Sequence, residues 1–399
     1  MATSLEGRQV VLQGCSCSDG LDSLCLFEAD PDIAGIGILL SFIITACTTH
    51  LMVLYTYFFA LQSDKRAPLG KLDRTITTEV RRACTWLFTP IARLITNDGK
   101  LHRMWQVLVQ GDSLFPILVI LTDQQIITGL AIITVGYAKT GTMTEYHFAL
   151  VSNLATLTVV VHDSVANVLR HRTTHHSVNM QAYKAIAVIC FMMMALVAQI
   201  PSGHQYWLVS YGLPVQCIWN SINGNIRSNT PQSAVMGTSL FLYTWAIIVT
   251  VDDYFPKLSS WAFDNAFVRA ANIYFLKAIL LPRTAYFASA RKRALAKTEL
   301  ATILWSIFEW SCFLMAAVIF TLCEVLNSEV LDLQRIWLLL ITSIQTIFVL
   351  RDYAGRNGRV GNEDGWGFGQ AVPIFLLLIP LSTILEAIYG TPVEVEEMA

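Results

Sequence analysis

The chain has 399 residues, of which 54% are hydrophobic and only 14% charged, and its mean hydropathy is +0.52. Such a composition is typical of an integral membrane protein and not of a soluble domain. The net charge of −2 indicates no class of partner, and no basic patch with interleaved aromatic residues suggests nucleic acid. The expected partners are therefore the lipid bilayer and a hydrophobic small molecule, while the oligomeric state stays open.

The first 32 residues are polar and acidic. A secretory signal peptide has a basic region before an apolar core, so this segment does not fit one. Residues 1–32 are expected to form an acidic tail, residues 33–390 a transmembrane domain, and residues 391–399 a short acidic tail. Membrane insertion would then rely on the first spanning helix.

Eight apolar segments are long enough to cross a bilayer as helices. They run approximately over residues 33–61, 113–137, 146–170, 181–200, 232–251, 301–325, 331–350 and 368–389. The expected fold is an all-α bundle of about eight transmembrane helices. No internal repeat is found, which disfavours a transporter built from inverted repeats.

The distribution of Lys and Arg supports this arrangement. When the 27 basic residues are assigned to the segments between spans, 23 fall on one face and 4 on the other, and rich segments alternate with poor ones. The positive-inside rule then places the rich face in the cytoplasm and both termini on the lumenal or extracellular face. The protein is expected in the endoplasmic reticulum or another internal membrane.

Two less apolar stretches, residues 262–281 and 78–95, are expected to lie on the cytoplasmic surface as amphipathic helices. Both carry charged residues within an apolar pattern, which suits a surface helix better than a further span. On the lumenal side, residues 206–222 are aromatic but interrupted by Pro214, and are expected to form a re-entrant or interfacial piece.

The nine cysteines include no CxxC pair, so no metal site is expected. Four of them fall on the lumenal side in this topology, namely Cys15, Cys17, Cys25 and Cys217. Oxidation there would tie the N-terminal tail to the fourth connecting segment, around residues 201–231. Three pairings of these four cysteines are open.

Four polar residues from four predicted helices fall at a similar depth, in the cytoplasmic half of the membrane. Asp123 lies about ten residues from the cytoplasmic end of its helix, Asp163 seven, Glu309 eight and Gln345 five. At a rise of 1.5 Å per residue these depths agree within about one and a half turns. A carboxyl group at such a depth costs roughly 3 kcal/mol on insertion scales, so a functional role is expected for the three acids.

The helical period gives each of these residues a face. Along residues 146–170, Asp163 and Asn167 share a polar face, whereas His162 points about 100° away from Asp163. The adjacent histidine and aspartate therefore cannot act as a couple on one face.

On the helix of Glu309, the side chains of Trp305 and Phe313 share the face of the acid and surround it with aromatic rings. Asp123 and Gln125 differ by about 200° around their helix. That helix therefore either lies in the centre of the bundle or is unwound near its threonine–glycine pair.

Buried polar side chains also hold helices together, by hydrogen bonds worth about 1 kcal/mol or less. This structural role is the alternative for Gln124, Gln125, Gln345 and Asn167. No Lys or Arg lies in the middle of a span, so an apolar, uncharged substrate is expected. Burial favours the protonated form of a carboxyl group, and a protonated buried acid is a proton donor.

A resemblance to a known family rests on three motifs. They are Gly111-Asp112-Ser-Leu-Phe, Thr122-Asp123-Gln124-Gln125-Ile-Ile-Thr128-Gly129-Leu-Ala-Ile and Tyr146-His147-Phe. Over residues 112–201 the chain resembles a large family of polytopic membrane proteins of filamentous fungi, and relatives of similar topology include the integral-membrane terpene cyclases of meroterpenoid biosynthesis. Residues 161–164, Val-His-Asp-Ser, depart from the family pattern, which more often has a hydroxyl residue before the histidine and no acid after it.

The resemblance implies that an acid protonates a terminal epoxide on a farnesyl chain and that the resulting cation cyclises. Asp123 or Glu309 would donate the proton, and the two glutamine amides that follow Asp123 would orient the epoxide oxygen. Asp163 or His162 would take the final proton. No cofactor is expected. Ring faces would stabilise the cations, and the aromatic residues expected to bind the substrate are Trp305, Trp310 and Phe313.

The main alternative is a small-molecule or proton-coupled transporter, in which the same acids relay protons. A transporter needs an aqueous path through both faces, whereas this polar layer is biased to one half of the membrane. A seven-helix receptor is disfavoured because neither an Asp-Arg-Tyr nor an Asn-Pro-x-x-Tyr motif stands at the expected helix ends.

Overall fold

The structure is a computed structural model of the chain. It describes residue 17 and residues 25–60, 71–95, 114–169, 178–204, 206–208, 211–225, 231–255, 328–356, 358–366 and 368–378, together with a few single residues between 303 and 318 and residue 382. The chain divides into two compact units. The first comprises residues 1–64, 90–250 and 336–399, and the second comprises residues 65–89 and 251–335.

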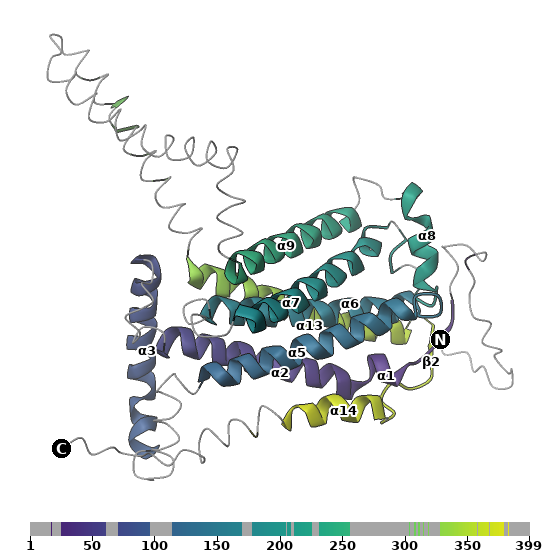
Figure 1. The fold of residues 1–399 in the computed structure, drawn as a ribbon, viewed down its shortest axis with the longest axis horizontal. Coiled ribbons are helices and arrows are strands. Elements are labelled where there is room, and N and C mark those ends of the chain that lie inside the picture. The colour runs from purple at the N-terminus through teal and green to yellow at the C-terminus, as the bar shows by residue number, and fades with distance from the viewer. Residues whose placement is uncertain are drawn as a thin grey trace. The chain divides into compact units, whose positions relative to one another are not determined.

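Among the described residues, six helical stretches are long and apolar enough to cross a membrane. They are the run formed by α1 (Pro31–Ala34), α2 (Ile36–Tyr55) and the π-turn η2 (Thr56–Ala60), then α5 (Leu114–Ala138), α6 (Glu145–Leu169), α7 (Val178–Ala198), α9 (Pro231–Tyr254) and α13 (Glu329–Arg356) (Figure 1). These six confirm a helical multi-pass membrane protein. The predicted count of eight is not confirmed, because residues 301–325 lie mostly outside the described part and α14 is described only over Phe368–Leu376.

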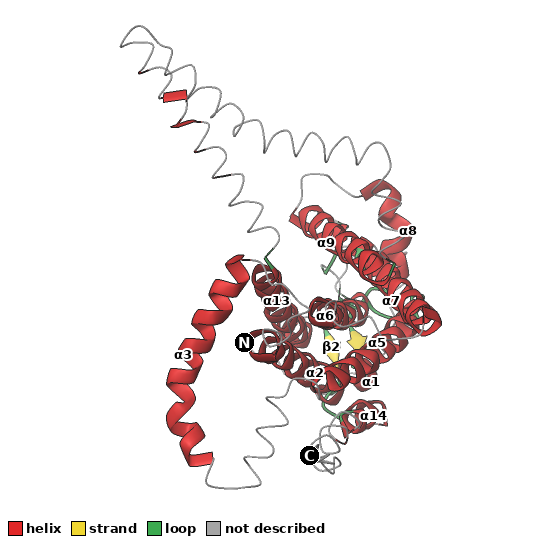
Figure 2. Cartoon of the chain, turned by 60° about the vertical axis from the view of Figure 1, so that its left-hand side comes forward, coloured by secondary structure: helices red, strands yellow, loops and turns green. Residues whose placement is uncertain are grey.

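Helix α6 lies in the middle of the first unit, with α2, α5 and α7 packed against it (Figure 2). Most of its side chains are buried, which explains why its sequence is apolar on nearly every face. Helix α5 contacts α2, α6 and α7 and is continuous through Thr128 and Gly129. The alternative of an unwound helix is therefore wrong. A central position for α5 is not confirmed, because Ile127 is 68% and Val135 43% exposed.

Two glycines allow α5 and α6 to approach closely. A Cβ atom on Gly129 would lie 2.7 Å from Oγ1 of Thr158, and one on Gly136 would lie 2.9 Å from Cγ1 of Val151. Thr158 cannot easily move away, because its side chain is branched at Cβ and its hydroxyl donates to the carbonyl of Leu154 at 3.2 Å. Small residues at such a contact are the usual means of close helix packing in membranes.

Four segments distant in sequence meet at one end of the first unit, around residues 25–35, 139–147, 200–218 and 351–370. The strand β1 (Phe27–Glu28) pairs in parallel with β2 (Arg359–Val360), and Thr144 forms an isolated β-bridge with Pro214. The short helices here are η5 (Ile200–Gly203) and α8 (Val215–Asn225). We call this the disulfide end.

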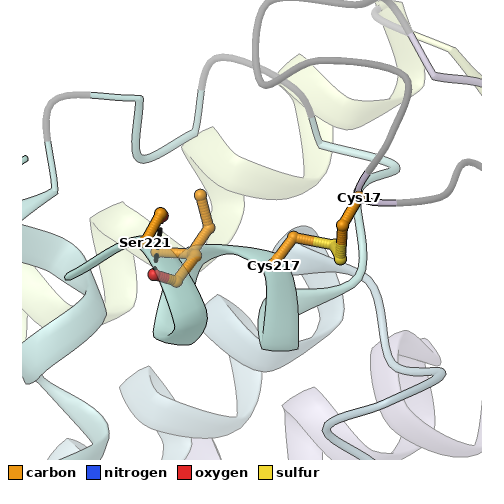
Figure 3. Close-up of a disulfide and its surroundings, with 4 residues drawn as sticks. Cys17, Cys217 and Ser221 are labelled. Carbon is orange, nitrogen blue, oxygen red and sulfur yellow. Dashed lines mark hydrogen bonds between the residues drawn. A yellow bond between two sulfur atoms is a disulfide. The ribbon is translucent and has the colours of Figure 1, made fainter. Parts of the chain in front are cut away.

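A disulfide joins Cys17 to Cys217 of α8, on the same helix as Ser221 (Figure 3). Cys25 is disulfide-bonded as well. The prediction that oxidation ties the N-terminal tail to the connecting segment after α7 is confirmed. The predicted interfacial piece at residues 206–222 contains most of α8, which is too short to span a bilayer.

A fully buried carboxylate, Glu363, holds the disulfide end together. Its Oε2 atom accepts hydrogen bonds from the Tyr146 hydroxyl at 3.1 Å, from Nη1 of Arg359 at 2.5 Å and from Nε of Arg351 at 3.4 Å. Arg351 also binds Asp364. Because a buried charge is tolerated only when it is paired and hydrogen-bonded, this cluster fixes α6, α13 and β2 beside one another.

The position of residues 351–367 corrects the predicted topology. An eight-span alternation places this loop on the face opposite to the N-terminal tail, but β2 pairs with β1 in that tail. Helix α13 therefore runs toward the disulfide end. Helix α9 runs away from it, since Met236 near its start packs against Gly203 while Thr250 contacts Met192. Helix α9 therefore ends, and α13 begins, on the face opposite to the disulfide end. The prediction of one membrane crossing between them, at residues 301–325, does not fit these two directions.

In the second unit, α3 (Lys71–Ile95) is an α-helix, as predicted for residues 78–95. The buried Asp73 carboxylate accepts a hydrogen bond from the Ser328 hydroxyl at 2.6 Å, at the start of α13. The placement of α3 on a membrane surface stays a prediction. Residues 262–281, the other predicted amphipathic helix, lie outside the described residues.

Replacement of Gly129 by Ala should destabilise the bundle, because the added methyl group would overlap Thr158. Overpacking of this kind typically costs about 1–3 kcal/mol. The matched control is Gly237→Ala in α9, where nothing lies within 4 Å of the added Cβ. Thermal denaturation in detergent should show a lower midpoint for Gly129→Ala alone. Equal midpoints for the two variants would contradict the close α5–α6 contact.

Candidate functional site

Polar residues of four helices lie at one depth in the first unit. Counted from the helix termini at the disulfide end, His50 of α2, Asp123 of α5, His162 of α6 and Lys184 of α7 lie 14 to 17 residues in. At the rise of an α-helix this corresponds to about 21–26 Å. We call these residues, with Thr49, Gln124 and Gln125, the polar layer.

An ion pair joins two helices in this layer. Nζ of Lys184 donates to Oδ2 of Asp123 at 2.5 Å, and the two side chains are 34% and 42% exposed. The sequence analysis found no Lys or Arg in the middle of a span, and it did not identify Lys184 as a partner of Asp123. Lys184 is near the end of its predicted span, where a lysine usually extends toward the headgroups, but its long side chain reaches inward to the acid instead. The paired carboxylate is not an isolated buried acid.

Two amides beside Asp123 carry buried atoms that lack hydrogen-bond partners among the described residues. These atoms are Oε1 of Gln124 and Nε2 of Gln125, and the Gln125 residue is only 2% exposed. A buried polar atom left unpaired costs about 1–3 kcal/mol, so such atoms usually await water or a ligand. The structural role, a hydrogen bond that ties two helices, is not seen for these two atoms.

Helix α2 adds two more buried polar side chains to the layer. His50 is 1% exposed and Thr49 is fully buried, and neither the imidazole nitrogens of His50 nor the hydroxyl of Thr49 has a hydrogen-bond partner among the described residues. The ring of His50 lies edge-on to that of Trp337 on α13, with centroids 4.9 Å apart. The sequence analysis missed His50, although a histidine inside the first apolar span was a signal that could have identified it.

Helix α6 contributes the predicted His162, Asp163 and Asn167. His162 is 3% exposed, while Asp163 and Asn167 are half-buried, in agreement with different faces for the histidine and the aspartate.

The part of the polar face of α6 that is nearer the disulfide end has a structural role. The hydroxyl of Thr156 is 2.7 Å from that of Tyr243 on α9, and Nε2 of Gln199 donates to the Ser152 hydroxyl at 2.8 Å. These hydrogen bonds tie α6 to α9 and to the end of α7, which is the common use of polar side chains between membrane helices.

The remaining predicted site residues do not join the polar layer in the described structure. Gln345 lies on an exposed face of α13 and is 11 residues from the end of that helix at Arg356, which is about one to one and a half turns closer to the disulfide end than the polar layer. Glu309, Trp305 and Phe313 lie outside the described residues. Trp310 is 70% exposed and belongs to the second unit. Roles for these residues stay predictions.

Comparison with known proteins gives one distant similarity. The chain is 26% identical over 189 residues to the "Elsinochromes biosynthesis cluster protein HP2" of Elsinoe fawcettii. The aligned part covers 45% of this chain and 48% of that protein, so the chain spans about half the length of the curated relative it matches. No family model and no solved structure matches the chain. The similarity is thus to a protein of a fungal secondary-metabolite gene cluster, and membership in the terpene cyclase family is not shown.

Replacement of Lys184 by Met should destabilise the first unit, because Asp123 would keep its charge without a partner. An ion pair reached by water is worth about 1 kcal/mol or less, and an unpaired charge in hydrocarbon costs more. The double variant Asp123→Asn/Lys184→Met removes both charges and should recover most of the lost stability. Thermal midpoints in lipid nanodiscs provide the measurement, and a double variant no more stable than Lys184→Met would contradict the pairing.

Proposed function

We propose that the protein is a membrane-embedded enzyme of secondary-metabolite biosynthesis that cyclises a prenylated intermediate. The similarity to a cluster protein of Elsinoe fawcettii supports the biosynthetic role. The resemblance of the Asp123-Gln124-Gln125 region to the family that includes membrane-bound terpene cyclases supports the reaction type.

The observation that carries this proposal is the composition of the polar layer. A charged pair, Asp123–Lys184, lies at the same depth as His50 and as two buried amide atoms that lack partners among the described residues. The surrounding helices are apolar, so a ligand that reaches this layer is mostly hydrocarbon with a small polar group. A prenyl chain that ends in an epoxide has this character.

The proposed reaction needs a proton donor, an oriented oxygen and a proton acceptor. The Asp123–Lys184 pair donates a proton to the epoxide oxygen as the C–O bond breaks, and the oxygen becomes a hydroxyl group. The Gln124 amide hydrogen-bonds the same oxygen, whereas Gln125 lies about 200° from Asp123 around the continuous helix α5 and takes no part in this step. The cation then accepts the π electrons of the next double bond, which closes a ring, and aromatic ring faces stabilise the cation.

The last step returns a proton to the protein. The cyclised cation loses a proton to a base of the layer, for which His50, His162 and Asp163 are the candidates, and a double bond forms. The overall change is an isomerisation, so it consumes no oxidant or reductant. Glu309 stays a second candidate for the initial donor.

We also propose that the disulfide end faces the lumen or the exterior. With residues 351–367 at the disulfide end, 21 of the 27 Lys and Arg residues are still assigned to the opposite face. The positive-inside rule then makes that opposite face cytoplasmic. Structural disulfides form in oxidising compartments, which agrees with the position of the Cys17–Cys217 bridge. The protein would then lie in the endoplasmic reticulum or another internal membrane, with its polar layer in the cytoplasmic half.

A proton-coupled transporter is the second candidate function. The observation that favours it is the Asp123–Lys184 pair itself, because an ion pair between two membrane helices can open and close as a proton binds. A transporter would move its substrate without changing it, so product analysis separates the two functions.

Replacement of Asp123 by Asn should abolish product formation without preventing insertion, because the amide keeps the shape of the side chain but cannot form the charged pair with Lys184 that donates the proton. Microsomes with the wild type or a variant are given an epoxyfarnesyl aromatic compound, and products are identified by mass spectrometry. The loss should be at least about 100-fold, the usual effect of removing a general acid. Glu309→Gln is tested alongside to decide between the two donors.

The matched control is Thr134→Val, an exposed position of the same helix whose hydroxyl donates only to the Leu130 carbonyl. Its microsomes should form product at the wild-type rate. If Asp123→Asn and Glu309→Gln both form product at the wild-type rate, the two acids have structural roles only. A wild type inactive on a panel of such substrates, but able to accumulate them in sealed vesicles, would favour the transporter.

A further inference from the structure

A second polar site lies at the disulfide end, far from the polar layer. A cavity of about 560 Å³ opens between residues 26–31, residues 139–144 and residues 212–214. This volume is in the range of small-molecule sites. Its walls include the apolar side chains of Phe27, Ile33 and Met143, and its polar lining includes Lys139, Thr142, Thr144 and His147.

Thr144 stands at the wall of this cavity with a base beside it. It forms the β-bridge with Pro214 and directly precedes α6, and its side chain is half-buried. Its Oγ1 is 2.7 Å from Nδ1 of His147. Both residues line the cavity, so the hydroxyl group is within reach of a ligand.

Behind His147 lies the buried carboxylate of Glu363. Nε2 of His147 is 3.9 Å from Oε1 of Glu363, and the two side chains are 5% and 0% exposed. Neither of these atoms has a hydrogen-bond partner among the described residues. Tyr146, Arg351 and Arg359 hold the other oxygen of Glu363, so Oε1 stays directed at the imidazole.

This order of groups sets the tautomer of His147. A carboxylate facing Nε2 favours the proton on that nitrogen, which leaves Nδ1 free to accept the Thr144 hydroxyl hydrogen. Burial raises the pKa of Glu363, while the guanidinium of Arg359 and the Tyr146 hydroxyl oppose that rise. The pKa of Glu363 stays raised, and the two guanidinium groups limit the effect of burial without reversing it.

A purely structural role for Thr144 explains only part of this arrangement. Its Oγ1 also accepts a hydrogen bond from the backbone N–H of His147 at 3.4 Å, as an N-cap residue does. A helix cap needs neither an imidazole on the hydroxyl nor a buried carboxylate behind the imidazole. Thr142, which lines the same cavity, has neither, and its hydroxyl donates to the Lys139 carbonyl at 3.3 Å.

We infer that Thr144, His147 and Glu363 form a nucleophile–base–acid site that transfers an acyl group from an ester or thioester. A hydroxyl, a histidine within hydrogen-bond reach and a third group that orients the histidine are the parts such a site requires. Thr144 and His147 are the catalytic residues, and Glu363 is a positioning residue that acts through His147.

The reaction proceeds in two balanced steps. Oγ1 of Thr144 attacks the carbonyl carbon as Nδ1 of His147 takes the hydroxyl proton, and that proton then goes to the departing alcohol or thiol as its bond to the carbonyl breaks. Water attacks the acyl-threonine in the same way, which releases a carboxylic acid and restores the hydroxyl. Lys139 supplies a cation at the cavity wall for the negative carbonyl oxygen, and the apolar wall accepts the acyl chain.

A fluorophosphonate probe tests this site, because it phosphonylates activated hydroxyl groups and needs no knowledge of the natural ester. The purified full-length protein in detergent is incubated with the probe, and the adduct is located by peptide mass spectrometry. The wild type and Thr144→Ser should both be labelled at residue 144. His147→Gln should be labelled at least about 100-fold more slowly, as expected for loss of a general base.

Two variants separate reactivity from folding. Thr144→Asn keeps a good helix cap but has no nucleophilic hydroxyl, so it should fold and escape labelling. Thr142→Val removes the neighbouring hydroxyl and should be labelled at the wild-type rate. Wild-type protein labelled no faster than Thr144→Asn, or labelled at another residue, would overturn the proposal and leave Thr144 as a helix cap.

The role of Glu363 is tested by shape against charge. Glu363→Gln keeps the shape of the side chain, and Glu363→Asp keeps its charge. Because this charge also binds two arginines, the control is Arg351→Gln, which weakens the cluster but leaves the carboxylate beside His147. A positioning role predicts faster labelling of Thr144 in Glu363→Asp and in Arg351→Gln than in Glu363→Gln, whereas a purely structural role predicts that labelling falls in Arg351→Gln as well. These readouts do not involve Asp123 or Lys184, so their outcome is independent of the proposed cyclase.

Discussion

The burial of one carboxylate, Glu363, constrains the whole first unit. Its charge is tolerated only because Arg351, Arg359 and the Tyr146 hydroxyl converge on it. These partners come from α13, from β2 and from the start of α6, so all three must end at the same place. The pairing of β2 with β1 and the Cys17–Cys217 bridge then bring the N-terminal tail to that place as well. The direction of α13 follows from this convergence.

The polar residues of the first unit lie at two levels along the helices, the disulfide end and the polar layer, and the two levels have different chemistry. At the disulfide end, Thr144 and His147 line an open cavity, and Glu363 lies behind His147. About 21–26 Å deeper along the helices, the polar layer places an ion pair and unpaired amide atoms among apolar helices. The first arrangement suits attack on a carbonyl group. The second suits proton transfer to a mostly apolar ligand.

Much of the bundle could be predicted from the sequence, because hydropathy over about 20 residues is a strong signal. The same was true of Asp123, Gln124 and Gln125, since polar residues inside an apolar run are costly. Lys184 was not predicted as the partner of Asp123, because a lysine near a helix end is normally read as a residue that reaches the headgroups. His50 was missed because it stands alone in the most apolar span, without a neighbouring acid.

The direction of α13 could not be predicted for a different reason. By the positive-inside rule, a loop that contains three arginines is predicted to be cytoplasmic, and these are Arg351, Arg356 and Arg359. The structure shows each of them in an ion pair with Glu363, Asp364 or Asp352, four to 13 positions away. Glu363 in turn accepts a hydrogen bond from Tyr146, which is 217 positions away in sequence. The Thr144–His147–Glu363 site was hidden for the same reason, since Glu363 is 216 positions from His147. Local pattern does not contain such contacts.

Topology mapping tests the central structural claim most directly. A short epitope is inserted after Gly365 in one protein and into the N-terminal tail in another, with a third epitope between residues 61 and 70 as a marker of the opposite face. Sealed microsomes are treated with protease before and after permeabilisation. The account predicts that the Gly365 and N-terminal epitopes respond alike and the third responds oppositely. A Gly365 epitope that behaves like the one between residues 61 and 70 would contradict the convergence on Glu363.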